Sequence, residues 1–221
     1  MRKLSEEELK NVLEDHKLWL ESNKDGKCAD LSHTDLSGAD LQDVDLSSAD
    51  LTDADLSEAN LSNADLSWSS LIRANLSNAK LVGAKLTNAY LSNANLIYAD
   101  LTDAVLASVN LINVNLTGAN LTRANLGWTN LTDVNLSGAN LNHADLRCAD
   151  LANANLTKAN LNHADLSEAS LVNVDLTGTN LTRTNLAWAN LTGANLFKVN
   201  LSAANLYYVN LANVKNLNTI I

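Results

Sequence analysis

The chain has 221 residues, of which only nine are aromatic, one is Met and none is Pro, so an ordinary aromatic-rich core is excluded. Its 15 Lys and Arg residues against 25 Asp and Glu residues give a net charge of −10, which disfavours nucleic acid as a partner. No run of about 18 apolar residues is present, and charge follows Met1 at once. We therefore expect no membrane-spanning helix, no secretory signal and no membrane partner, and predict a cytoplasmic protein.

Residues 1–26 are expected to form a capping unit whose main element is a helix over residues 6–22. The start of this segment carries a capping box and a hydrophobic staple, formed by Ser5 with Glu8 and by Leu4 with Leu9. Apolar residues then follow helical spacing, and Gly26 ends the segment. We expect the helix to cover the first coil of the region that follows. The alternative is an amphipathic helix that binds a membrane or a partner, but its acidic first turn argues against a membrane.

Residues 27–214 repeat with a period of five. Leu occupies every fifth position from Leu31 to Leu211, 37 times without exception. The residue two positions before each Leu is always small, and the residue just before it is Asp or Asn in 31 of 37 cases. A period of five fits neither a helix nor a strand. It fits a solenoid in which each pentapeptide forms one short side, points its Leu to the axis and bonds the backbone at a polar corner.

Segments such as ADLQD (39–43) and ANLTR (119–123) match the motif A(D/N)LXX, and by them the chain resembles the pentapeptide repeat family. The resemblance implies an all-β solenoid, a right-handed quadrilateral parallel β-helix of about nine coils with an N-terminal α-helical cap. In this family four pentapeptides make one coil, so residues 20 apart are stacked. Because Leu and Ala fill the narrow tube, we expect no pocket, no cofactor, no metal and no catalytic site, and hence no enzyme.

The acidic charge is confined to the first coils. Residues 30–65 contain ten acidic residues and no Lys or Arg, whereas residues 66–221 sum to +1. Stacked coils place like charges above one another, which is unfavourable. A weakly bound cation or a basic partner would relieve this repulsion. In the alternative that we favour, Asp makes the same corner bond as Asn and salt screens the repulsion.

Stacking of successive coils also places unusual side chains in columns on the outside. One column consists of Trp68, Trp128 and Trp188. Another consists of Arg123, His143, His163 and Arg183. The Trp column would suit a sugar, another ligand or a partner protein, and the paired His residues suggest a metal that the flanking Arg residues disfavour. In the alternative that we favour, these faces are solvated and inherited, because a stretch repeated 60 residues later explains Trp128 with Trp188 and Arg123 with Arg183. Cys28 and Cys148 are six coils apart, about 29 Å, which excludes a disulfide between them.

Departures from the motif gather in one part of the chain. Six of the 37 positions before Leu are neither Asp nor Asn, and five of the six lie between residues 70 and 105. Bulky outward residues occur in the same stretch, so an otherwise polar surface carries apolar and aromatic groups. We expect an interaction surface formed by Ile72, Arg73, Lys80, Lys85, Tyr90, Ile97, Tyr98, Val105 and Ile112. The alternative is sequence drift in a tolerant solenoid.

Register is lost after Leu211, and residues 215–221 form a tail without a capping helix. Either this tail folds over the last coil or two rods meet there, because an open coil end exposes unpaired backbone groups. Family members that dimerise use this end, so the resemblance favours a homodimer. The expected contact residues are Phe197, Tyr207, Tyr208, Leu217, Ile220 and Ile221.

Two functions fit these features. The first is a non-enzymatic rigid rod that acts as an interaction or scaffold module through its outer faces, with an unidentified protein partner. The alternative rests on the resemblance, because quinolone-resistance members of the family mimic DNA and bind gyrase, so this chain would inhibit or protect a type II topoisomerase. The charge argues against the alternative, since a DNA mimic should be acidic along its whole length.

Overall fold

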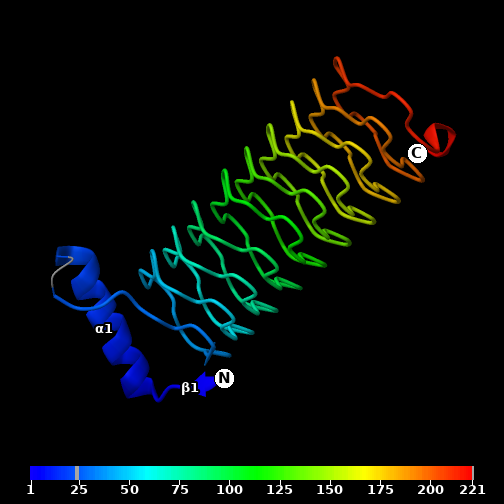
Figure 1. The fold of residues 1–221 in the computed structure, drawn as a ribbon. Helices are drawn as coiled ribbons and strands as arrows, with labels where there is room; N and C mark the ends of the chain where they lie inside the picture. Colours follow the sequence, from blue (N-terminus) through cyan, green and yellow to red (C-terminus); the bar gives the residue numbers. More distant parts are fainter. Residues whose placement is uncertain (23–24, 221) are drawn as a thin grey trace.

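The computed structural model describes residues 1–22 and 25–220. Figure 1 shows a straight stack of coils, with helix α1 lying across one end and a short 3-10 helix at the other. The elements in chain order are β1 (Arg2–Lys3), α1 (Glu6–Ser22), β2 (Thr34–Asp35) and the 3-10 helix (Leu217–Thr219). Between them the backbone forms single bridges and turns, because a pentapeptide side is too short for a regular strand.

Four pentapeptides make one turn of the stack. The residue before each Leu pairs in parallel with the equivalent residue four pentapeptides later, from Asp30 with Asp50 to Asn195 with Lys215. Residues 29–215 therefore make a little over nine coils. These coils confirm the predicted four-sided parallel stack and the number of its coils. Its right-handed winding stays a prediction.

Each corner is a tight turn that the motif explains. The carbonyl of Leu36 accepts the N–H of Ala39 at 3.0 Å, and equivalent bonds recur along the stack. The second residue after Leu has a positive φ, +57° at Arg73, as in a type II turn. The Oδ1 of Asp45 accepts the N–H of Ser47, two residues on, at 2.9 Å. This contact, which Asn makes equally well, confirms the predicted corner bond.

The interior is a packed column of Leu with a small residue beside each one. Every repeat Leu from Leu31 to Leu196 is at most 3% exposed. Each contributes about 1.5–3 kcal/mol of burial, before the entropy cost of ordering the chain. Where Thr129 replaces Ala, its hydroxyl donates to the carbonyl of Leu106 at 3.0 Å, so the polar group is satisfied. The surface is therefore where this protein can act.

The helix expected at residues 6–22 is present as α1. The capping box forms as predicted, with Ser5 N donating to Glu8 Oε2 at 2.7 Å and Glu8 N donating to Ser5 Oγ at 3.2 Å. Leu4, Leu9, Val12 and Leu13 pack against the core of the stack. The helix is therefore the cap of the first coil.

Two further contacts fasten the cap, and the sequence did not predict them. Strand β1 pairs in parallel with β2, Arg2 with Thr34 and Lys3 with Asp35, and covers part of the open edge of the first coil. On α1, the fully buried His16 accepts the N–H of Ala29 at Nδ1, 3.1 Å away. Burial lowers the pKa of His16, although Asp45 acts in the opposite direction.

The C-terminal tail folds back on the preceding coil. Thr219 Oγ1 accepts the N–H of Lys198 at 3.1 Å, and Asn216 Nδ2 donates to Asn195 Oδ1 at 2.7 Å. Leu206 is nevertheless 42% exposed, so much of the end of the last coil stays uncovered. The predicted folding of the tail over the last coil is therefore observed in part, and the meeting of two rods at this end stays a prediction.

In the part of the chain that the structure describes, no helix combines the length and the apolarity needed to cross a bilayer.

Candidate interaction surface

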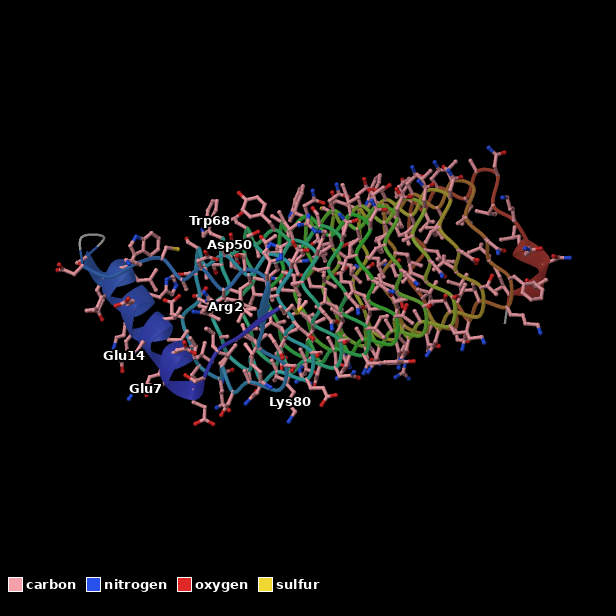
Figure 2. The ribbon with its side chains drawn as sticks, turned by 60° about the horizontal axis from the view of Figure 1, so that its bottom comes forward. Arg2, Glu7, Glu14, Asp50, Trp68 and Lys80 are labelled. Atoms are coloured by element: carbon pink, nitrogen blue, oxygen red, sulfur yellow. The ribbon has the colours of Figure 1, made fainter. Side chains whose placement is uncertain are left out.

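The nine residues predicted to form one surface surround the rod instead of sharing a face. Their positions in the four-sided coil place Ile72, Arg73 and Ile112 at one corner, with Tyr90 on the adjoining side. Ile97 and Tyr98 lie at the next corner. Lys80 lies on the side opposite Tyr90, and Lys85 and Val105 are stacked on a third side. Figure 2 shows Lys80 and the nearby Trp68 projecting from opposite sides of the rod. We call these nine residues the girdle; their role in binding stays a prediction.

Two of the three basic residues of the girdle are already paired. Lys85 Nζ lies 3.3 Å from Asp65 Oδ2, and Arg73 Nε donates to Asp53 Oδ1 at 2.7 Å. The hydrogen bond from Arg73 lowers the pKa of the Asp53 carboxyl. Within residues 1–22 and 25–220, Lys80 has no ion-pair partner, so it is the girdle cation available to a partner.

The exposed aromatic residues of the girdle are Tyr90 and Tyr98, at 54% and 63% exposure. The ring of Tyr98 lies over Gly118 in the following coil, where an added Cβ would clash with a ring carbon. The glycine therefore provides the space in which Tyr98 lies along the corner. Ile72, Ile97 and Ile112 are half-buried. The girdle thus presents two tyrosines on different sides, with aliphatic groups between the polar corners.

The residues predicted for C-terminal association divide between two opposite corners. Phe197, Leu217 and Ile220 gather near one corner, where Ile220 packs against the core. Tyr207 and Tyr208 are at the opposite corner and contact Trp188, a neighbour that the four-pentapeptide spacing could have indicated. Ile221 lies outside the described residues. One end-to-end contact would therefore have to use two separate apolar groups.

The three tryptophans of the predicted column share one corner and are exposed to solvent. Trp68, Trp128 and Trp188 are 57%, 71% and 58% exposed, and all have a positive φ. A left-handed backbone costs a non-glycine residue about 1–2 kcal/mol. Since Asn and Gly fill this turn position elsewhere, these rings are not there to ease the turn.

The predicted His column also forms. The rings of His143 and His163 stack with centroids 4.7 Å apart and planes 8° apart. Next to the His pair in this column, Arg123 Nε donates to Asp103 Oδ1 at 2.7 Å. In the described part of the chain, no three His, Cys, Asp or Glu side chains are placed to hold one metal ion.

The acidic first coils satisfy their carboxylates locally. Asp30 Oδ1 accepts the N–H and the hydroxyl of Ser32 at 3.1 and 2.6 Å, and these bonds lower the pKa of Asp30. In the same coils Asn60 Nδ2 donates to Asp40 Oδ1 at 2.9 Å. These contacts support the corner-bond explanation for the Asp residues. Both thiols are free, and burial raises the pKa of Cys28.

A groove contradicts the expectation that the protein has no pocket. It opens between α1 and the first coil, outside the Leu column, and has a volume of about 1130 Å³. Its apolar lining includes Leu9 and Leu13 from α1 and Leu36 and Val44 from the first coil. The sequence argument considered only the interior of the repeat, where the prediction of close packing is correct.

We compared the chain with protein families and with curated proteins. The chain matches the family described as pentapeptide repeats at residues 29–67, 69–106, 99–138, 135–171, 159–196, 169–206 and 184–215. A search of curated proteins gave no match.

Several solved structures are similar to this one. HetL, a pentapeptide repeat protein involved in heterocyst differentiation regulation from the cyanobacterium Nostoc sp. strain PCC 7120, is 29% identical. The alignment covers 96% of this chain and 94% of HetL, with a TM-score of 0.80. Rfr23 from the cyanobacterium Cyanothece 51142 is 33% identical over 51% of this chain and 90% of its own, with a TM-score of 0.49. QnrB1, a plasmid-mediated fluoroquinolone resistance protein, is 18% identical over 84% and 83%, with a TM-score of 0.37. From the family matches over residues 29–215 and the likeness to HetL, the chain belongs to the pentapeptide repeat family.

Proposed function

We propose that this protein is a non-enzymatic rigid rod that binds a partner protein through its outer faces, with the girdle as the contact surface. The observation that carries the proposal is the girdle itself. Within about two coils, five positions before Leu lack the Asp or Asn that makes the corner bond. The exposed Tyr90 and Tyr98 and the unpaired Lys80 occur in the same coils. Exposed aromatic side chains are enriched at contact sites between proteins.

Rigidity supports this role. Backbone hydrogen bonds join neighbouring coils all along the stack, for example Leu121 N to Asn140 O at 2.7 Å. Because each coil contacts only its neighbours, such a rod can hold separate surface groups at fixed spacing. We infer a right-handed winding, as the family resemblance implies, and a cytoplasmic location.

Restoring the motif tests the girdle. The variant carrying Lys80→Asn, Lys85→Asn, Tyr90→Asn and Val105→Asn should keep its fold, because Asn at each position can accept the N–H two residues on. It should lose at least tenfold in affinity for a partner captured by the wild-type chain. Ser170→Asn restores the same motif outside the girdle and should bind like wild type. Unchanged affinity of the fourfold variant would place the contact elsewhere.

We also propose that the C-terminal end associates with a second copy of the chain. The exposed Leu206 and Leu211 leave apolar surface and backbone groups of the last coil in water. In sedimentation experiments the wild-type chain should be a dimer. The Leu206→Asp variant should be a monomer, because the new charge would be buried in the contact between the two copies. A wild-type monomer at high concentration would refute association at this end.

One observation favours the alternative function as a DNA mimic that acts on gyrase, namely the ten acidic residues within 30–65. These residues cover under two coils, and Asp53 and Asp65 are paired with basic side chains. We therefore expect no change in the rate of DNA supercoiling by gyrase when the protein is added. Inhibition that is lost when the acids of residues 30–65 are neutralised would establish the alternative.

A further inference from the structure

An aromatic group covers one corner of the last coils, far from the girdle. Trp188 and Tyr208 occupy equivalent positions in successive coils and stack with ring centroids 4.4 Å apart and planes 13° apart. Tyr207 stands edge-on to both rings, 6.0 Å from Trp188 and 4.3 Å from Tyr208. All three side chains are more than half exposed. The stack therefore holds the Trp188 ring in place while leaving it accessible to solvent.

Glu168 is the neighbour of Trp188 in this column on the side away from Tyr208. Glu168 occupies the same corner one coil earlier, where its N–H donates to Ala187 O at 2.9 Å. Its side chain is exposed, with Oε2 at 3.9 Å from the thiol of Cys148, and Glu168 and Trp188 together line a shallow hollow of about 450 Å³. Since Tyr208 covers one face of the indole, the hollow combines a π face with a negative charge.

The surroundings of the hollow carry acidic groups and no free cation among the described residues. On this corner and its two sides, residues 145–210 contain one basic residue, Arg147. Its guanidinium is held by both oxygens of Asp145, at 2.8 and 2.6 Å. Asp165 and Glu168 form no ion pair within residues 1–22 and 25–220. The hollow therefore complements a positive group and has no cation of its own.

We propose that Trp188 and Glu168 bind an arginine side chain of a partner protein, with the guanidinium stacked on the indole and hydrogen-bonded to the carboxylate. A guanidinium is planar, stacks on aromatic faces and matches a carboxylate with two parallel N–H donors. This site rests on the proposed function, that the protein binds a partner protein, but it lies on a surface separate from the girdle. It adds the chemical group of the partner that is recognised, an arginine side chain.

The test uses the peptide acetyl-Gly-Arg-Gly-amide and NMR of the Trp indole N–H groups, assigned with Trp188→Phe. The Trp188 signal should shift saturably, and the signal of Trp68 should not, because the equivalent residues in the coils before and after Trp68 are the uncharged Ser48 and Asn88. Glu168→Gln should weaken binding at least fivefold. Glu58→Gln, which removes the same charge from another exposed corner, should leave it unchanged.

The matching peptide with citrulline in place of Arg, equal in shape but neutral, should not bind. Equal shifts at Trp68 and Trp188, full affinity in Glu168→Gln, or binding of the citrulline peptide would each overturn the assignment. The fourfold girdle variant leaves the Trp188 corner unchanged. Partner capture by that variant therefore tests the proposed function separately from the arginine site. Partner capture without peptide binding would overturn the arginine site alone.

Discussion

Replacing Asn140 by Asp separates the two roles of the residue before Leu. Asn140 Oδ1 accepts the N–H of Asn142 at 3.2 Å and the side-chain amide of Asn160 at 3.2 Å. Its own Nδ2 donates to Asn120 Oδ1 at 3.3 Å and to Thr122 Oγ1 at 2.9 Å. Asp keeps the two accepted bonds, including the corner bond, and loses the two donated ones.

The size of the effect follows from the bonds removed. A partly buried hydrogen bond contributes about 0.5–1.5 kcal/mol net, so Asn140→Asp should lower the free energy of unfolding by about 2 kcal/mol. Asn140→Ala removes all four bonds and should cost about 3 kcal/mol, since water recovers part of the loss. Stability should therefore decrease from wild type to Asp to Ala.

Urea unfolding followed by circular dichroism measures these differences, and Asn110→Asp is the matched control. Asn110 Oδ1 accepts the N–H of Ile112 at 3.1 Å, and within the described residues its amide nitrogen donates no hydrogen bond. This control should therefore lose less than about 0.5 kcal/mol. Equal losses at both positions, or no loss in Asn140→Asp, would refute the idea that amide donation between coils stabilises the rod.

The remaining predictions concern the core, pH and redox. Leu121→Ala should cost about 3 kcal/mol and Leu206→Ala about 1 kcal/mol in chemical unfolding, because Leu121 is fully buried and Leu206 is 42% exposed; equal costs would contradict an open C-terminal end. Stability should decrease as pH falls below 6.5, the ordinary pKa of His, because the unfolded chain takes up a proton that buried His16 resists, and His16→Leu should flatten this part of the pH profile. A profile unchanged in His16→Leu would exclude His16 as its cause. Reducing agents and chelators should leave the melting temperature unchanged, because both thiols are free; a fall of several degrees with either reagent would reveal a disulfide or a metal.

The sequence by itself determined the coil and its cap. A Leu at every fifth position can be buried throughout only if each pentapeptide turns one corner, so the periodicity predicts which side chains form the core. The helix Glu6–Ser22 was equally predictable, because its start depends on contacts between Ser5 and Glu8, which are close neighbours in the chain. Both features depend on residues that are close together in the chain, so they can be predicted without knowing how distant segments pack.

Only the tertiary structure decided which outer groups meet. The sequence placed the girdle residues in one stretch, but the coil distributes them over three sides and two corners, so residues close in the chain do not share one face. The groove beside α1 and the pairing of β1 with β2 depend on how the cap docks, which no repeat specifies. The contact of Trp188 with Tyr208 and the Lys85–Asp65 pair depend on the rotamers of side chains in successive coils. Regular repetition constrains the side chains that point inward, whereas those that point outward are positioned by neighbours in adjacent coils.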